Sequence, residues 1–261
     1  MLKITATNLY GQSLQVTQNS LFRLTAAGLN PPAGVVYTAD LATKNGSLYN
    51  GSKVQNRYIT LTAWPAGRSP ENARLELYKV FKISKFVRLQ ITNGTRSCYI
   101  DGYVEDMPGE SDTPTQSMQI AIVCPDPFLT AAAETTASVP TAGTAVTVNN
   151  GGDFETGAEF SITATGACSG ITITNSTTGQ TFGVNVTLAA GDKLTLMTYQ
   201  GGKSLTLKRS GQDPTNILNL MTAGSVWPIL QPGNNSVQFA ATSGGANAAM
   251  TVKFSALYGG I

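Results

Sequence analysis

Strict alternation of apolar and polar residues marks three strands in the first half of the chain. The stretch RYITLTA places Ile59, Leu61 and Ala63 on one side, and VRLQI at 87–91 and MQIAIVC at 118–124 show the same period of two. This period is typical of strands that bury one face. The three runs therefore predict an antiparallel sheet.

One helix is predicted between the first two of these strands, in SPENARLELYKVFKI. Pro70 suits the first helical position, and Glu71 lies in the first turn, where the helix dipole stabilises a carboxylate. Leu75, Tyr78 and Phe81 follow at helical spacing, so we expect them to form the apolar face. One amphipathic helix on an antiparallel sheet predicts an α+β domain.

The stretch 28–56 carries the turn sequences NPPAG, KNGS and YNGS. So many turn signals are unusual in a plain core element. They indicate extended loops or a protruding hairpin.

The second half of the chain is a series of short alternating runs separated by turn dipeptides such as Thr178-Gly179 and Gly201-Gly202. No helix signal interrupts them. A succession of seven or more strands over about 130 residues predicts an all-β, jelly-roll-like sandwich of two antiparallel sheets. The runs are EFSITATG, GITITNS, VNVTLA, KLTLMTY, KSLTLKR, SVQFAAT and MTVKFSALY.

A domain boundary is predicted near the midpoint. In AIVCPDPFL, at 121–129, Pro125 and Pro127 remove backbone donors and end the strand. Residues 1–131 hold 12 basic and 9 acidic side chains and 9 glycines, whereas 132–261 hold 5, 6 and 18. We therefore predict one domain on each side, with FLTAAAETTASVPTAGTA as a short linker or an irregular first strand.

Composition excludes several functional classes. The 261 residues are 41% hydrophobic, which predicts a folded protein, and 17 basic against 15 acidic side chains give a net charge of only +2. Such a weak charge, without a basic stripe, argues against nucleic acid or an anionic membrane as the principal partner. The start of the chain lacks the features of a signal peptide, and no apolar run approaches the roughly 20 residues of a spanning helix. We expect a protein made and kept in a cytoplasm.

The chain has three cysteines and no CxxC pair. An odd number without that spacing predicts neither a disulfide framework nor a zinc site. Cys98, Cys124 and Cys168 are expected to be free and mostly buried thiols.

Catalytic chemistry is disfavoured because the chain has no histidine, which removes the usual nucleophile systems and the commonest general base. GACSG at 166–170 matches a nucleophile elbow, but no helix follows it and no base is available, so a tight turn with a buried thiol is the better interpretation. Asp153, Glu155 and Glu159 alternate onto one side of a strand. They could form a glycosidase dyad or a calcium site, but a solvated face explains them better. No catalytic, cofactor-binding or metal-binding residue is predicted.

Trp227, in SVWPILQPGNN, is the remaining candidate for a binding residue. It could stack on a sugar ring, although packing of a core residue near a turn explains it better. The residues alone thus predict a two-domain, β-rich binding or assembly protein that is not an enzyme.

Several segments, in this order, resemble the distal tail proteins of long-tailed, siphovirus-type bacteriophages. The resemblance spans nearly the whole chain and rests on the order and spacing of the segments. It implies an α+β belt domain at 1–131 and a galectin-like β-sandwich at 132–261. The segments are KNGSLYNGSKVQNRYITLTAW, SPENARLELYKVF, YIDGYVED, MQIAIVCPDPFL, GQTFGVNVTLAAGDKLTLMTYQGGKSLTL, SVWPILQPGNNSVQF and the terminal YGGI.

The resemblance implies a structural function. Distal tail proteins form hexameric rings at the virion tail tip, where belt domains surround the DNA channel and the second domains lie outside. The implied partners are the tail tube protein, the tail-tip hub and receptor-binding proteins. DNA passes through the channel without specific binding, no membrane is involved, and assembly takes place in the cytoplasm of the bacterial host.

The implied site is an interface between proteins. A carbohydrate-binding or receptor-binding tail accessory protein, with Trp227 as a contact, is the alternative. Without histidine the chain lacks part of the usual galectin sugar-binding constellation. The interface residues carried over from the resemblance are Arg57, Tyr58 and Ile59 in the belt sheet and Pro125, Asp126 and Pro127 at the domain exit.

Overall fold

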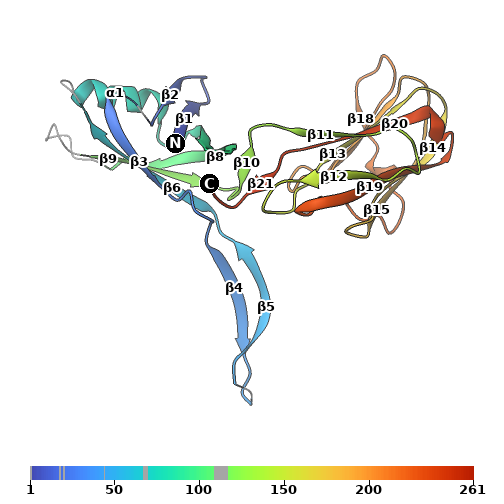
Figure 1. The fold of residues 1–261 in the computed structure, drawn as a ribbon, viewed down its shortest axis with the longest axis horizontal. Coiled ribbons are helices and arrows are strands. Elements are labelled where there is room, and N and C mark those ends of the chain that lie inside the picture. The colour runs from blue at the N-terminus through green and yellow to red at the C-terminus, as the bar shows by residue number, and fades with distance from the viewer. Residues whose placement is uncertain (1, 18, 20, 44, 67–69, 109–116) are drawn as a thin grey trace. The chain divides into compact units, whose positions relative to one another are not determined.

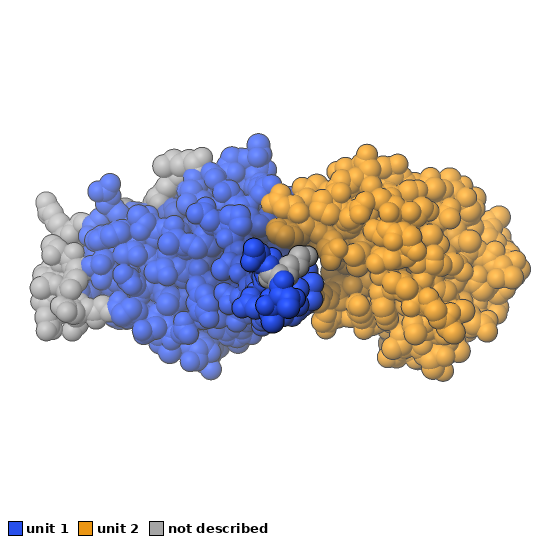
Figure 2. Space-filling model, turned by 90° about the horizontal axis from the view of Figure 1, so that it is seen from below, with its two compact units in different colours: residues 1–132, 258–261 blue, residues 133–257 orange. Residues whose placement is uncertain are grey.

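The computed structural model of the protein describes residues 2–17, 19, 21–43, 45–66, 70–108 and 117–261. It contains two compact units, coloured separately in Figure 2. Unit 1 comprises residues 1–132 and 258–261, and unit 2 comprises residues 133–257. The predicted second domain, 132–261, therefore differs from unit 2 chiefly at its end, because the last four residues belong to unit 1.

Unit 1 is built on an antiparallel sheet with the strand order β2-β1-β7-β8-β9-β6-β3. A further strand, β10 (Leu129–Ala131), pairs with β8 and with β21 (Leu257–Tyr258). The strands of the main order are β1 (Lys3–Asn8), β2 (Ser13–Gln15), β3 (Phe22–Ala27), β6 (Arg57–Pro65), β7 (Phe86–Asn93), β8 (Arg96–Asp106) and β9 (Met118–Cys124).

The three predicted strands of the first half are confirmed as β6, β7 and β9, and each buries alternate residues. The central strand β8 is the longest of the sheet, yet its pattern is hidden because a buried position holds Gly102. A Cβ atom there would lie 2.6 Å from Ile122 Cγ2 and 2.9 Å from Cys124 Sγ. Glycine is required by the close approach of β9, and the sequence gives no apolar signal at that position.

The predicted helix is confirmed as α1 (Pro70–Val80), but its predicted face is partly wrong. Phe81 is buried as expected, whereas Leu75 and Tyr78 are each 48% exposed. The helix instead buries Ala73, Leu77 and Val80. These positions follow the i, i+4, i+7 spacing of a core-facing stripe, and the small side chain of Ala73 made that stripe inconspicuous.

The stretch 28–56 forms the predicted protruding hairpin. Strands β4 (Gly34–Asp40) and β5 (Ser47–Val54) pair with each other as a separate two-stranded sheet. Figure 1 shows the hairpin leaving the main sheet of unit 1 at the ends of β3 and β6.

Unit 2 is a sandwich of two antiparallel sheets, with strand orders β11-β20-β13-β16-β17-β18 and β12-β19-β14-β15. Phe160 and Phe254 of the first sheet and Phe182 and Phe239 of the second are fully buried in one shared core. The first sheet consists of β11 (Thr135–Val139), β13 (Glu159–Ala164), β16 (Lys193–Met197), β17 (Ser204–Lys208), β18 (Thr215–Asn216) and β20 (Ala248–Phe254). The second consists of β12 (Val146–Asn150), β14 (Cys168–Asn175), β15 (Gln180–Leu188) and β19 (Gly233–Ser243), and two short 3-10 helices are η1 (Leu218–Leu220) and η2 (Gly245–Asn247).

The seven runs predicted in the second half all coincide with strands of this sandwich. The segment 128–145 is more ordered than a linker, because it contains β10 of unit 1 and β11 of unit 2. Pro125 and Pro127 lie directly beyond β9, which ends at Cys124.

Replacing Gly102 by alanine should destabilise unit 1 by about 1–3 kcal/mol, the usual cost of overpacking a core. The cause is the contact of the new methyl group with Ile122 and Cys124. Urea unfolding followed by fluorescence measures the change. Gly34→Ala is the control, because its Cβ would meet only Lys53 O at an ordinary 3.7 Å. Equal stability of the two variants would contradict this account of β8.

Limited proteolysis should cut the chain first between Ala132 and Thr135 or between 140 and 145, where consecutive residues are mostly exposed between strands. Mass spectrometry identifies the sites, and circular dichroism shows whether each fragment keeps its strands. Preferential cleavage inside 180–256 would contradict two independently folding units.

Candidate functional site

The largest group of exposed apolar side chains in the described part of unit 1 lies on the β4–β5 hairpin. Val36 and Tyr49 are 61% and 62% exposed, and Tyr37 and Leu48 are about half exposed. A two-stranded hairpin with this composition is marginal in water on its own. Exposed apolar clusters of this kind mark surfaces that bind another protein. The β-branched and aromatic run GVVYTAD between turn sequences is the only sequence signal for these exposed side chains, and they were not among the predicted interface residues.

A second apolar row crosses the open face of the unit 1 sheet. Phe86 pairs with Tyr103, Tyr103 with Val123, and Val123 with Tyr58, on the adjacent strands β7, β8, β9 and β6. The Phe86 and Tyr103 rings meet edge to face with centroids 6.3 Å apart. Tyr58, one of the predicted interface residues, is 60% exposed in this row. It is therefore available to a partner.

Arg57 and Ile59 point to the opposite face of β6 and are buried, with Arg57 only 2% exposed. The guanidinium of Arg57 donates to four backbone carbonyls. Nε reaches Pro127 at 2.6 Å, Nη1 reaches Gly28 and Asn30 at 2.8 and 2.7 Å, and Nη2 reaches Gly259 at 2.6 Å. Burial lowers the pKa of Arg57, because desolvation disfavours the charged form. Within the isolated chain, Arg57 is therefore an internal tie: its hydrogen bonds hold separate backbone segments of unit 1 together.

The residues at the predicted domain exit are placed at the surface. Pro125 and Asp126 are exposed and Pro127 is half-buried. The Asp126 carboxylate accepts a hydrogen bond from the Phe128 amide at 3.2 Å, which shapes the turn after β9. The Pro127 carbonyl is held by Arg57. The exit segment is thus ordered by contacts within unit 1.

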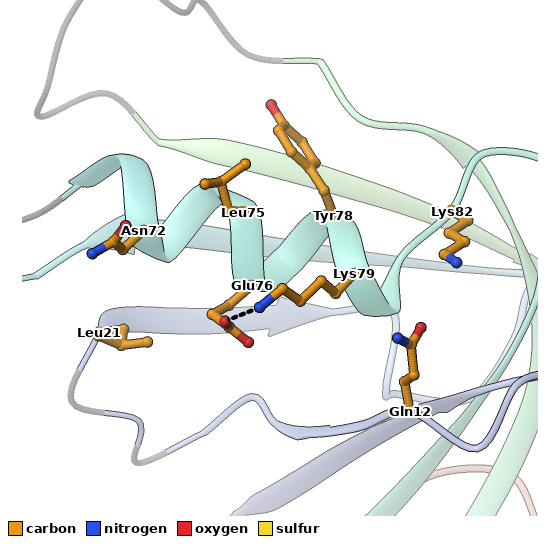
Figure 3. A pocket seen from close by; sticks show the side chains of 8 residues that line it. All are labelled: Gln12, Leu21, Asn72, Leu75, Glu76, Tyr78, Lys79 and Lys82. Carbon is orange, nitrogen blue, oxygen red and sulfur yellow. Dashed lines mark hydrogen bonds and ion pairs between the residues drawn. The ribbon is translucent and has the colours of Figure 1, made fainter.

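A shallow depression of about 690 Å³ lies beside α1 (Figure 3). On its α1 side, the Glu76 carboxylate and the Lys79 ammonium form an ion pair at 2.5 Å, one turn apart on the helix. It is open and holds no nucleophile with a base, so it suits contact with a protein surface better than enclosure of a small ligand. Its lining residues are Gln12, Leu21, Asn72, Leu75, Glu76, Tyr78, Lys79 and Lys82.

Trp227 in unit 2 is partly buried against the core. Its ring lies 4.8 Å from that of Phe182, and Lys203 Nζ sits 5.7 Å from its centroid. The segment after it is pinned by buried amides, since Asn175 Nδ2 donates to the Ile229 carbonyl at 2.7 Å. Trp227 therefore packs against the core of unit 2 and is only partly exposed.

The carboxylates considered for catalysis do not converge on a site. Asp153 and Glu155 are exposed, and Glu159 faces Lys193 at 4.0 Å. Among the residues that the structure describes, no cluster of histidine, cysteine and carboxylate side chains could hold a metal ion. In the same residues no helix combines the length and the apolar character needed to span a membrane.

All three cysteines are free and buried, as predicted. Cys168 begins β14, so GACSG is the turn that leads into a strand. Burial raises the pKa of each thiol, and that of Cys124 reaches about 12. A thiol with a raised pKa is a poor nucleophile, which disfavours cysteine catalysis at these positions.

Comparison with known proteins identifies the kind of domain in unit 2. Residues 151–258 match the family described as siphovirus-type tail component, C-terminal domain, which confirms the resemblance to phage tail proteins. No curated protein sequence matches the chain.

The fold of the chain is similar to that of a solved phage protein. The Dit protein of phage SPP1, described as a hub adsorption apparatus protein of phages infecting Gram-positive bacteria, aligns with a TM-score of 0.71 and 15% identity. The alignment covers 97% of this chain and 98% of that one, so the two share a fold over nearly their whole length. A chain of the phage p2 baseplate aligns over 97% of this chain and 98% of its own with 11% identity and a TM-score of 0.49.

Near pH 8 the native protein should react slowly with a thiol reagent such as DTNB, because buried thiols with raised pKa values hold few thiolates. In denaturant all three thiols should react. Fast reaction of any thiol in the native state would contradict its burial.

The Cys124 shift also predicts a pH dependence of stability. The pKa of the Cys124 thiol in the folded state lies above its ordinary value of 9.0. The contribution of the neutral thiol to the free energy of unfolding is therefore complete below pH 9 and is lost as the pH rises towards 12. Urea unfolding of the wild type should therefore show a steeper alkaline loss than that of Cys124→Ala. If the free energy of unfolding fell equally with pH in both proteins, the raised pKa of Cys124 would be contradicted.

Proposed function

We propose that this chain, whose residues 151–258 belong to the siphovirus-type tail components, is a structural protein of a phage tail tip that assembles into a closed ring through unit 1. The ring joins the tail tube to the tail-tip hub and leaves a channel for DNA. No step of this function requires catalysis, a cofactor or a metal ion. Six copies is the number that the resemblance to distal tail proteins implies.

The observation that carries this proposal is the β4–β5 hairpin. The hairpin, with its exposed apolar residues, projects from the main sheet of unit 1 between β3 and β6 (Figure 1). Tyr58, at the start of β6, is also exposed. Contact of such a projecting element with a different surface of the next copy is heterologous, so it closes into a ring when the rotation permits.

The edges of the sheet support the same conclusion. The outermost strands of the main order, β2 and β3, each have one paired neighbour in that order. Unpaired strand edges are templates for pairing with another chain. The net charge of +2 offers little repulsion against the packing of several copies.

Unit 2 is better suited to the outside of such an assembly. Its sheets cover each other's apolar faces in one core, so it has less exposed apolar surface that needs a partner. Receptor-binding proteins or the hub are the partners expected there. Trp227 does not favour the alternative of a carbohydrate-binding accessory, because its ring is engaged by Phe182.

The proposal predicts a ring of about six copies for the full chain, alone or mixed with its tail tube protein, by light scattering and negative-stain microscopy. The double variant Tyr37→Ser and Tyr49→Ser should lose the ring and remain folded, because both side chains are exposed on the hairpin. Val226→Ser, which removes an exposed apolar side chain of unit 2, is the matched control and should keep the ring.

Two results would contradict the assignment. One is a ring that survives the hairpin variant but is lost with substitutions in unit 2. The other is a monomer both alone and with the tube protein.

A further inference from the structure

Four Asn-Gly dipeptides occur in the chain, at 45–46, 50–51, 93–94 and 150–151. This pair of residues is chemically reactive. The backbone nitrogen of the glycine can attack the side-chain carbonyl carbon of the asparagine, because the glycine has no side chain to obstruct the approach. The rate at each pair then depends on how firmly the fold holds the asparagine amide and the backbone beside it.

One pair lies at an irregularity of the β4–β5 hairpin. Thr38 pairs with Tyr49 and Tyr37 with Gly51, so Asn50 has no partner on β4. An extra residue of this kind forms a β-bulge, at which the hydrogen-bond ladder is disrupted. Asn50 is exposed, and a Cβ atom on Gly51 would meet no heavy atom within 4 Å. The backbone at this pair is therefore uncrowded.

A second pair, Asn45-Gly46, lies in the loop that joins β4 to β5, and both of its residues are exposed. A two-stranded hairpin is marginally stable in water, so local opening of its backbone costs little free energy. Asn93-Gly94 is exposed at the turn between β7 and β8. All three asparagines can thus reach the reactive geometry without the unfolding of a core.

The fourth pair is held by the core of unit 2. Asn150 is 1% exposed, and its Nδ2 donates to the carbonyls of Phe154 and Leu230 at 3.0 and 3.1 Å. Its Oδ1 accepts from the Gly152 amide at 3.0 Å. Attack on this side chain would require three hydrogen bonds to break at a buried position. The same dipeptide is therefore protected there.

We propose that Asn45 and Asn50 are sites of spontaneous deamidation, which places negative charge on the hairpin, whereas the fold protects Asn150. The glycine nitrogen loses its proton to hydroxide and bonds to the asparagine Cγ. The Cγ–Nδ2 bond breaks, and the departing nitrogen takes a proton from water and leaves as ammonia. Water then opens the resulting succinimide ring to aspartate or isoaspartate. The reaction is faster at higher pH, because the attacking nitrogen must lose its proton.

The modification affects the surface through which we propose that the ring assembles, and this consequence rests on the proposed function. Among the described residues of the hairpin strands only Asp40 and Lys53 are charged. Deamidation of Asn50 adds a carboxylate next to the exposed ring of Tyr49. A carboxylate is costly to bury in an interface without a partner. A deamidated copy should therefore join the ring less readily.

The sites are tested by incubating the native full chain at pH 8 and assigning each conversion by mass spectrometry with peptide fragmentation. Asn45, Asn50 and Asn93 should convert, and faster than at pH 6. Conversion of Asn150 should be at least about tenfold slower, the factor that a local opening cost of about 1.4 kcal/mol imposes. In guanidinium chloride all four sites should convert at comparable rates. Absence of conversion at Asn45 or Asn50, or equal rates at these sites and Asn150 in the native chain, would overturn the proposal.

The consequence is tested by ageing the protein at pH 8 before assembly and measuring the yield of ring by light scattering. The yield should fall with time for the wild type but not for the double variant Asn45→Gln and Asn50→Gln, because glutamine would have to close a larger and less favourable ring. Asn93→Gln is the matched control and should age like the wild type.

An equal loss of ring in the wild type and the double variant would refute the effect on assembly. A fresh wild type that forms no ring would instead contradict the proposed function. In that case the mass spectra alone still decide whether the hairpin is modified.

Discussion

The organisation of unit 1 depends on a single buried guanidinium. Arg57 sits on β6 with 2% of its surface exposed and donates to carbonyls from three separate parts of the chain. Hydrogen bonds from a charged donor contribute about 1.5–3 kcal/mol each, and an unpaired buried charge is costly. The four backbone carbonyls that bind Arg57 therefore fix the positions of three segments: the base of the hairpin, the segment that follows β9, and residues 258–261.

The two units differ in how completely they bury their apolar side chains. Unit 2 covers its apolar residues with two facing sheets and fastens its loops with buried amides such as Asn150, Asn175 and Asn235. Unit 1 covers one face of its sheet with a helix and leaves aromatic residues on the open face and on the hairpin. The contrast supports the proposed assembly through unit 1. Residues 151–258 of the chain match the siphovirus-type tail component family.

The sequence predicted elements well where a local period was visible and poorly where one residue replaced the expected apolar side chain. The alternation of β6, β9 and the strands of unit 2 could be recognised because most of their inward positions hold apolar side chains such as Ile, Leu, Val, Met or Phe. In β8 the inward position at Gly102 carries no side chain, and in α1 the stripe begins at Ala73. Leu75 and Tyr78 have the size of core residues, yet the helix turns them to the surface. For them, hydrophobicity was a poor guide to burial.

The sequence by itself determined the alternating strands, the single helix, the hairpin, the change of character near Pro125 and the buried thiols. All of these follow from neighbouring residues, since pleat and helical turn relate positions two to four apart. Only the tertiary structure decided that Arg57 is an internal tie while its neighbour Tyr58 faces outward, and that the chain end returns to unit 1. The carbonyl that meets Arg57 belongs to Gly259, 202 residues away. A backbone carbonyl has no sequence signature, because every residue carries one, so the path of the folded chain alone brings the two together.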